Sequence, residues 1–294
     1  FMKIGILFYA YNQENFVRKG LSSIFSQAIP AGSQVELLII DDGSSDSTLF
    51  TIKDLTDSVR RPQAISDWTI TVIDRKEQGN QGQAATLKEG LSNLKSDYVF
   101  VLEGDDFWIS KHHIVNLISL MADYEFISGA FASWISLDET YNLIDSRIAD
   151  KPENLSQNLI TFDSLLEKNT PGTLSCCGFR GETLRSILDF INDQQEIADW
   201  GINLRLAIEG PLMWHHDVSV VYRHSEDSIW RKKSSIERAR FTSKALERYA
   251  DHFEGAAKTK AKRRAREIIE ETSTVWVVGR ALRHPLRALR ILLA

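Results

Sequence analysis

Three carboxylates stand close together in the stretch YVFVLEGDDFW, residues 98–108. Glu103, Asp105 and Asp106 follow directly after an apolar run over residues 98–102. Like charges this close repel one another, so they share a proton or recruit a cation. Hard carboxylate oxygens suit Mg²⁺ or Mn²⁺, which also bind phosphates. We therefore expect a metal-held diphosphate here; the alternative is a solvated acidic turn.

A second acidic stretch, IIDDGSSDST, covers residues 39–48. Asp42 could accept a hydrogen bond from an N–H group of a ligand, such as that of a uracil ring. Alternatively, Asp42 braces the turn and Asp46 or Ser47 caps the helix that follows. The residue types alone leave both interpretations open.

Histidines gather later in the chain, where His215, His216 and Asp217 are consecutive and Arg223 and His224 follow. Clustered histidines indicate metal ligation or contact with a diphosphate. We therefore include His216 among the candidate metal ligands. The alternative is that His216 and Asp217 only begin a strand.

Strands and helices that alternate must position these residues. Apolar runs typical of strands cover 3–9, 35–40, 69–73 and 98–102, and apolar residues at helical spacing follow the first three. Such repeats predict an α/β fold with a mostly parallel sheet, right-handed crossovers and all carboxyl ends at one edge. Open sheets of this kind bind ligands at that edge.

The pattern loosens after about residue 125. We expect strands over 126–135, 173–181 and 212–222, helices over 182–192 and 199–208, and only helices from about 230 onward. These segments are the expected source of acceptor contacts, although no motif marks them.

Composition narrows the function classes. The chain has 294 residues, a formal charge of −5 and a pI near 5.9, and it lacks the interleaved basic and aromatic residues of a nucleic-acid groove. Cys176 and Cys177 are adjacent and form no disulfide framework, which indicates a reducing, cytoplasmic compartment. The first apolar run is too short to span a membrane.

The last residues, 279–294, predict an amphipathic helix. Its arginines and leucines gather on opposite sides: Arg280, Arg283, Arg287 and Arg290 against Leu282, Leu286, Leu289 and Leu293. Such a helix suits an anionic membrane surface, with the protein peripheral on the inner face of the cell membrane. The alternative is docking of the leucines on protein, including a homo-oligomer formed through the C-terminal helices.

Four motifs in order resemble the family-2 glycosyltransferases with the GT-A fold: Tyr11-Asn12, IIDDGSSDST, Asn80 to Gly82, and LEGDDFW. The resemblance covers about residues 3–230. It implies a GT-A catalytic domain over 1–230, with a nucleotide-sugar half over about 3–125 and an acceptor half over about 126–230. A helical extension then covers 231–294.

The resemblance also assigns residues. It implies donor contacts at Tyr9, Ala10, Tyr11, Asn12, Glu14, Asp42, Gln81, Gly82, Glu103 and Asp105, and a Mn²⁺ or Mg²⁺ site at Asp105 and Asp106. Three departures from the family pattern matter: Tyr9-Ala10 replaces the usual Pro-Thr, Glu103 replaces the first Asp of the Asp-x-Asp motif, and Ala198 replaces the Glu of a later Glu-Asp pair.

The family's general base falls on Asp199, since its usual Glu-Asp pair appears here as Ala198-Asp199. At the start of a helix, the dipole would favour the charged form of Asp199. A helix cap is the structural alternative. Trp200 could stack on the acceptor sugar or could lie in the core.

The expected function is therefore inverting transfer from a nucleotide-diphosphate sugar, with a UDP-sugar as the first choice. The acceptor would be a hydroxyl of a glycan or lipid-linked glycan in cell-surface polysaccharide synthesis, and the sugar a hexose or N-acetylhexosamine. A non-catalytic nucleotide-sugar binder or interaction protein on the same scaffold is the alternative. Nucleotidyl transfer would require a glycine-rich basic loop after the first strand, and residues 9–14 contain none.

Overall fold

The computed structural model describes residues 1–60, 67–138, 140–149, 155–191, 198–223 and 233–272. The chain divides into two compact units, each considered by itself. The first comprises residues 1–165 and 169–224, and the second comprises residues 166–168 and 225–294.

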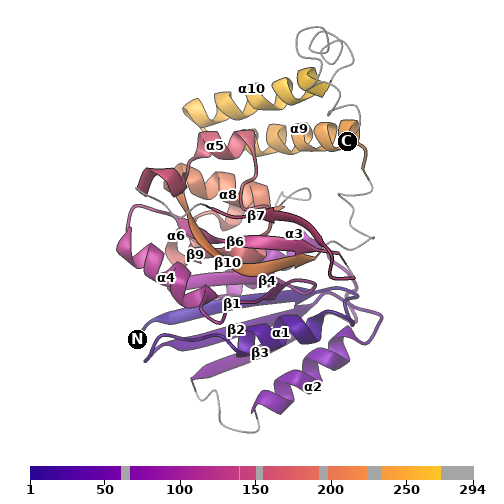
Figure 1. Cartoon of the computed structure of the whole chain (residues 1–294). Helices are drawn as coiled ribbons and strands as arrows, with labels where there is room; N and C mark the ends of the chain where they lie inside the picture. The colour runs from indigo at the N-terminus through magenta and orange to yellow at the C-terminus, as the bar shows by residue number, and fades with distance from the viewer. Residues whose placement is uncertain (61–66, 139, 150–154, 192–197, 224–232, 273–294) are drawn as a thin grey trace. The chain divides into compact units, whose positions relative to one another are not determined.

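The four predicted parallel strands are present in the first unit (Figure 1). They pair in parallel in the order β3-β2-β1-β4, with the bounds β1 Lys3–Ala10, β2 Gln34–Asp41, β3 Trp68–Asp74 and β4 Tyr98–Glu103. Three helices connect them: α1 Val17–Phe25, α2 Thr48–Arg60 and α3 Gln83–Asn93. Buried residues of α1 such as Val17, Leu21 and Ile24 belong to the apolar face that the spacing predicts.

The strand order explains where a ligand can bind. The chain moves outward from β1 to β2 to β3, then returns to place β4 on the other side of β1. Connections that leave β1 in opposite directions run over opposite faces of the sheet, because each crossover is right-handed. The strand order therefore reverses between β1 and β4, and in open α/β sheets ligands bind beside such a point, at the carboxyl ends of the strands.

The second half of this unit extends the sheet mostly with antiparallel pairs, whereas β6 and β10 pair in parallel. Beyond β4 the order continues β9-β6-β10-β5, with β7 paired to β6 and β8 to β10. The strand bounds are β5 Phe107–Trp108, β6 Gly129–Leu137, β7 Leu143–Arg147, β8 Leu159–Ile160, β9 Cys177–Arg180 and β10 Leu212–Arg223. The helices are α4 His113–Asp123, η1 Leu155–Asn158, α5 Phe162–Glu167, η2 Leu174–Cys176, α6 Gly181–Ser186, α7 Leu188–Ile191 and α8 Ala198–Glu209.

Two predicted elements in this half need correction. The strand predicted over 173–181 is limited to Cys177–Arg180, because the Thr173 hydroxyl accepts the N–H of Ser175 and begins the short 3₁₀ turn η2. The helix predicted over 182–192 divides into α6 and α7, with a break at Ile187. Both adjacent cysteines are free and buried, as expected of a pair that forms no disulfide.

The second unit contains two helices, α9 Ser235–Asp251 and α10 Gly255–Thr272, which pack against each other. A capping box begins α9: the Ser234 hydroxyl accepts the N–H of Glu237, and the Glu237 carboxylate accepts the N–H of Ser234. Ser243 of α9 donates to the carbonyl of Ala265 of α10. The helical prediction is correct for these residues.

Within the described residues, no helix is both long and apolar enough to cross a bilayer. His224 and the amphipathic segment 279–294 lie outside the described residues.

Candidate active site

The acidic cluster lies where β4 ends, at the point where the strand order reverses. One carboxylate oxygen from each of Glu103, Asp105 and Asp106 lies within 4.8 Å of the others. Gly104 makes this turn possible: a Cβ there would lie 2.2 Å from the Gln13 side chain and 2.6 Å from Ala10. The turn after β4 is thus pressed against the turn after β1, because glycine has no side chain.

Burial makes the cluster electrostatically unfavourable when all three groups are charged. Loss of solvation, then repulsion from Asp106, Asp105 and Asp199, raises the pKa of Glu103 well above its usual value. Burial and repulsion from Asp105 likewise raise the pKa of Asp106 well above its usual value. A cation would offset this cost, and a set of hard oxygen ligands fits Mn²⁺ or Mg²⁺. The residues present therefore suit the divalent ion that the sequence predicts.

Hydrogen bonds hold the cluster in place. Asp106 is 1% exposed; its Oδ1 accepts the backbone N–H of Arg223 at 2.9 Å, and its Oδ2 accepts the Thr173 hydroxyl at 3.4 Å. The N–H of Glu103 donates to the Ser175 hydroxyl at 3.1 Å. Segments far apart in the sequence, β4, η2 and the end of β10, therefore meet at these acids.

Arg223 adds a positive group beside the acids. Its guanidinium carbon lies 4.9 Å from the ring centre of Phe16 and 5.0 Å from that of Phe107. Its charge lowers the pKa of Asp105, although burial, the larger effect, leaves that pKa raised. The ring centre of Tyr141 lies 5.2 Å away, so three aromatic rings hold the guanidinium beside the acids.

Asp42 lies in a buried ionic network at the ends of β2 and β3. Its carboxylate accepts Nη1 of Arg75 at 2.7 Å and the N–H groups of Gln81 and Gly82 at 3.1 and 2.9 Å. Both side chains of the ion pair are 6% exposed. Arg75 also donates to Thr86 and to Glu89. A pocket of about 280 Å³ lies beside this network, lined by Ile73, Arg75, Gln78, Gln81, Ala85 and Glu89.

The loops after β1 and β2 are joined by side-chain hydrogen bonds. Oδ1 of Asn12 accepts the N–H of Ser45 at 2.8 Å, and Oε2 of Glu14 accepts the N–H of Ser47 at 2.8 Å. Asp46 accepts the N–H groups of Glu14 and of Thr48, the first residue of α2. The predicted donor residues Asn12 and Glu14 thus brace the acidic loop, whichever ligand contacts they also make.

Tyr9 reaches the acidic cluster from the end of β1. Its hydroxyl accepts a hydrogen bond from Gln83 Nε2 at 3.0 Å, and the same amide lies 3.4 Å from a carboxylate oxygen of Glu103. Burial, then the charge of Glu103, raises the pKa of Tyr9 well above its usual value, so this phenol stays neutral. Tyr9 can therefore donate a hydrogen bond to an anionic group.

Asp199 lies in the first turn of α8 and faces the same site. Its charge is among the causes that raise the pKa of Glu103. Oδ2 of Asp199 accepts Nδ2 of Asn169 at 2.7 Å. Burial raises the pKa of Asp199 despite this bond and the nearby charge of Arg147. Burial therefore opposes the stabilisation of the charged form that is expected at the start of a helix.

Two sequence assignments do not fit the geometry. The Trp200 indole is 4% exposed and donates to the carbonyl of Leu165 at 2.8 Å, so it is a core residue that cannot stack on a sugar. The N–H of Arg223, at the end of β10, donates to Asp106. His216 lies seven positions earlier on the same strand, a distance of roughly 20 Å. His216 therefore cannot share an ion with Asp105 and Asp106.

Sequence reasoning missed the partners that position the candidate residues. Arg75 directly follows β3, so the sequence places it at a strand end. No local pattern predicts that it pairs with Asp42. Asn169 and Arg147 come from loops and strands with no motif. Arg147 donates to the carbonyls of Asn169 and Thr170, which holds the loop whose amide contacts Asp199.

Comparison with known proteins agrees with this architecture. The family described as Glycosyl transferase family 2 matches residues 6–188. An uncharacterised protein of Mycobacterium tuberculosis is 24% identical over 296 residues, 99% of this chain and 78% of the relative. Glycosyltransferase GlyA of Streptococcus pneumoniae is 31% identical over 115 residues, 39% of this chain and 14% of GlyA.

Solved structures share the GT-A fold. TarS 1-349 of S. aureus, in complex with UDP-GlcNAc, has a TM-score of 0.65 at 14% identity and covers 93% of this chain and 74% of its own. The mannosyltransferase PcManGT from Pyrobaculum calidifontis, in complex with GDP-Man and Mn²⁺, has a TM-score of 0.63 at 15% identity. The alignment covers 98% of this chain and 78% of the PcManGT chain.

Proposed function

The chain belongs to glycosyl transferase family 2, and from that premise we propose that it transfers a sugar from a nucleotide-diphosphate donor with inversion at the anomeric carbon. The first-choice donor is a UDP-sugar that carries a hexose or an N-acetylhexosamine. The acceptor is a hydroxyl of a glycan or lipid-linked glycan in cell-surface polysaccharide synthesis.

One observation carries the proposal: the short segment 169–173 contacts both Asp199 and the acidic cluster, since Asn169 donates to Asp199 and Thr173 donates to Asp106. Inverting transfer needs a base on one side of the anomeric carbon and a stabilised leaving diphosphate on the other. A lone carboxylate opposite an acidic, cation-binding turn provides both groups in one site.

Asp199 is the group that removes the proton from the acceptor hydroxyl. Asn169 donates to Oδ2 and so helps to orient the carboxylate for this role. A pKa raised by burial makes the carboxylate a stronger base than an exposed aspartate, provided that it is ionised. Asn169 and Arg147 act by orienting the carboxylate and its loop.

On the donor side, Asp105 and Asp106 would hold Mn²⁺ or Mg²⁺, with Glu103 beside them. When bound, the ion supplies positive charge to the diphosphate. Arg223, held against Phe16 and Phe107, contributes a second positive charge to the departing group. Neutral Tyr9 donates a hydrogen bond to the same group.

The Asp42 and Arg75 pair supports a site for the nucleotide base at the ends of β2 and β3. TarS is a structural neighbour bound to UDP-GlcNAc, and PcManGT is one bound to GDP-Man, which supports a nucleotide sugar as the donor. We further propose that residues 279–294 bind an anionic membrane surface and so bring the enzyme to a lipid-linked acceptor. These residues lie outside the described part of the chain.

Asp199→Asn tests the base directly, since the amide keeps the size of the side chain but cannot accept the proton. We expect the variant to bind nucleotide with near-native affinity and to lose about a hundredfold or more in transfer rate. Asp123→Asn makes the same chemical change at an exposed position at the end of α4 and is the matched control.

Transfer by Asp199→Asn at a near-normal rate would remove Asp199 from the mechanism. A wild-type protein that binds nucleotide sugars but neither transfers nor hydrolyses them, with Mn²⁺ or Mg²⁺ present, would instead favour the non-catalytic alternative.

A further inference from the structure

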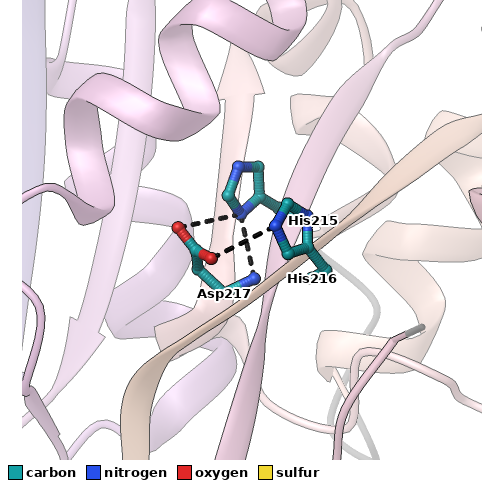
Figure 2. Close-up of side chains that lie close together, drawn as sticks. All are labelled: His215, His216 and Asp217. Atoms are coloured by element: carbon teal, nitrogen blue, oxygen red, sulfur yellow. Dashed lines mark hydrogen bonds and ion pairs between the residues drawn. The ribbon is translucent and has the colours of Figure 1, made fainter. Parts of the chain in front are cut away.

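His215, His216 and Asp217 form a second group of potential ligands (Figure 2). Consecutive residues of a regular strand point to opposite faces, so three in a row do not normally meet. Here the register between β10 and β6 shifts between His215 and Val218. This β-bulge turns the three side chains toward one another, and bulges often re-aim side chains at functional sites.

The ligand atoms lie at spacings close to those around a metal ion. Nε2 of His216 is 3.3 Å from Oδ1 of Asp217, and Nδ1 of His215 is 4.0 Å from Oδ2. One ligand atom from each residue lies within 4.8 Å of the others. Metal–ligand bonds of about 2.1 Å in a tetrahedral site place ligand atoms about 3.4 Å apart. In this structure Nδ1 of His215 accepts the N–H of Asp217 at 3.2 Å, a hydrogen bond that a bound ion would replace.

The protein holds this arrangement from behind. Asn116 of α4 donates to Oδ2 of Asp217 at 3.1 Å and fixes the carboxylate. Ser133 of β6 donates to the carbonyl of His215 at 3.0 Å and holds the bulged backbone. The two imidazole rings stack with centres 4.9 Å apart and planes inclined at 17°. Such outer partners orient the ligands of known metal sites.

We propose that His215, His216 and Asp217 bind a divalent cation of borderline softness, with Zn²⁺ as the reference ion. Two imidazole nitrogens and one carboxylate oxygen are a ligand set of zinc sites, whereas Mg²⁺ and Ca²⁺ prefer oxygen ligands. This site is separate from the acidic cluster, because His216 lies roughly 20 Å along β10 from Arg223, which donates to Asp106.

Three protein ligands leave at least one coordination position for water. The His216 and Asp217 side chains are 38% and 51% exposed and the His215 side chain is 16% exposed, so an ion can enter without local unfolding. The bulge lies on the strand whose last residue, Arg223, donates its N–H to Asp106. A bound ion would therefore stabilise the bulged part of the strand that leads to the active site.

Titration of the whole, chelator-treated chain with Zn²⁺ tests the proposal. Excess Mg²⁺ would be present to occupy the oxygen ligands of the acidic cluster. We expect one Zn²⁺ to bind, and Co²⁺ in its place to give the visible absorption of a nitrogen-ligated, low-symmetry ion. The probes are the two metals alone, so the result does not depend on transferase activity.

His216→Ala and Asp217→Asn should each weaken Zn²⁺ binding by about a hundredfold or more, and Asn116→Ala by about tenfold. His252→Ala removes an exposed histidine at the end of α9 and should leave the affinity unchanged. Circular dichroism would establish that each variant is folded. The proposal would be overturned if both His216→Ala and Asp217→Asn bound Zn²⁺ with the affinity of the wild type. A Co²⁺ complex with oxygen ligands only would also overturn it.

Discussion

The two ligand clusters of the catalytic unit differ in the environment that the fold gives them. Glu103, Asp105 and Asp106 are all acidic, and they stand at the end of a buried strand where they repel one another. His215, His216 and Asp217 combine imidazoles with one carboxylate, and they lie at a more exposed bulge inside a strand. Burial lowers the pKa of His215 and favours the neutral ring, so repulsion is small.

This difference separates two reasons for binding a cation. The acidic cluster stores unfavourable charge that a cation relieves, so catalysis and stability should both respond to the ion. The histidine cluster stores little charge, and its ion would bind through ligand type and geometry. Substitutions that remove charge from the acidic cluster should therefore affect both transfer and stability.

The largest effect is expected at the acidic cluster. Asp106→Asn keeps the oxygen that accepts the N–H of Arg223 but removes the charge, so the diphosphate loses its ion. We expect transfer to fall by about a hundredfold to a thousandfold, the scale of a lost electrostatic contact in the transition state. Initial rates with saturating Mn²⁺ would measure this, with Asp123→Asn as the control. Full turnover of the wild type in excess chelator would show that the acidic cluster acts without a divalent ion.

An intermediate effect is expected at His113, which lies buried against Trp108 with ring centres 4.6 Å apart. Burial, with a smaller contribution from His215, lowers the pKa of His113 to about 3. The unfolded chain binds this proton near pH 6.5 and the folded chain does not, so stability is present above pH 6.5 and is lost as pH falls.

The loss from this residue between pH 6.5 and pH 5 should be about 2 kcal/mol. His113→Phe keeps a ring in place and removes the titration, so urea unfolding of the variant should show a flatter acid limb than the wild type. An identical pH dependence in the two proteins would contradict the assignment.

The smallest effect is expected at Glu103, and it has the opposite sign. Its pKa is raised in the fold, so its stabilising contribution is present at low pH and is lost as pH rises through that value. Glu103→Gln should therefore stabilise the metal-free protein near pH 8 by on the order of 1 kcal/mol, about 2–4 °C in Tm.

The gain from Glu103→Gln should shrink as the pH falls, because protonation of the wild-type carboxylate removes the repulsion. It should also shrink in Mn²⁺, which stabilises the wild type more than the variant. Thermal unfolding of both proteins under these conditions measures it. A variant that is less stable than the wild type at pH 8 without metal would show that repulsion is not the dominant property of the cluster.

Several features of the first half could be predicted because they depend on neighbours in sequence. Uninterrupted apolar runs make buried strands, helical spacing makes the connections, and right-handed crossovers place all strand ends at one edge. Polar residues that follow each strand, among them Asp42 and Glu103, must then gather at that edge. The parallel direction of these strands and the position of the acidic cluster at their carboxyl ends follow from these local patterns.

Contacts between distant segments could not be predicted in the same way. Antiparallel β9 enters the sheet between β4 and β6, and a strand of that length carries no signal of its partner. Trp200 shows the same limit, because only packing decides whether an indole faces a sugar or the core. Its place in the core depends on the carbonyl of Leu165.

The sequence by itself determined the α/β class, the parallel strands, the acidic motif and the resemblance that points to Asp199. Only the tertiary structure paired Asp42 with Arg75, placed Asn169 against Asp199, and placed His216 away from the acidic cluster. The reason is physical. Local patterns decide which element forms and where it ends, whereas register, bulges and buried ion pairs depend on packing between segments far apart in the chain.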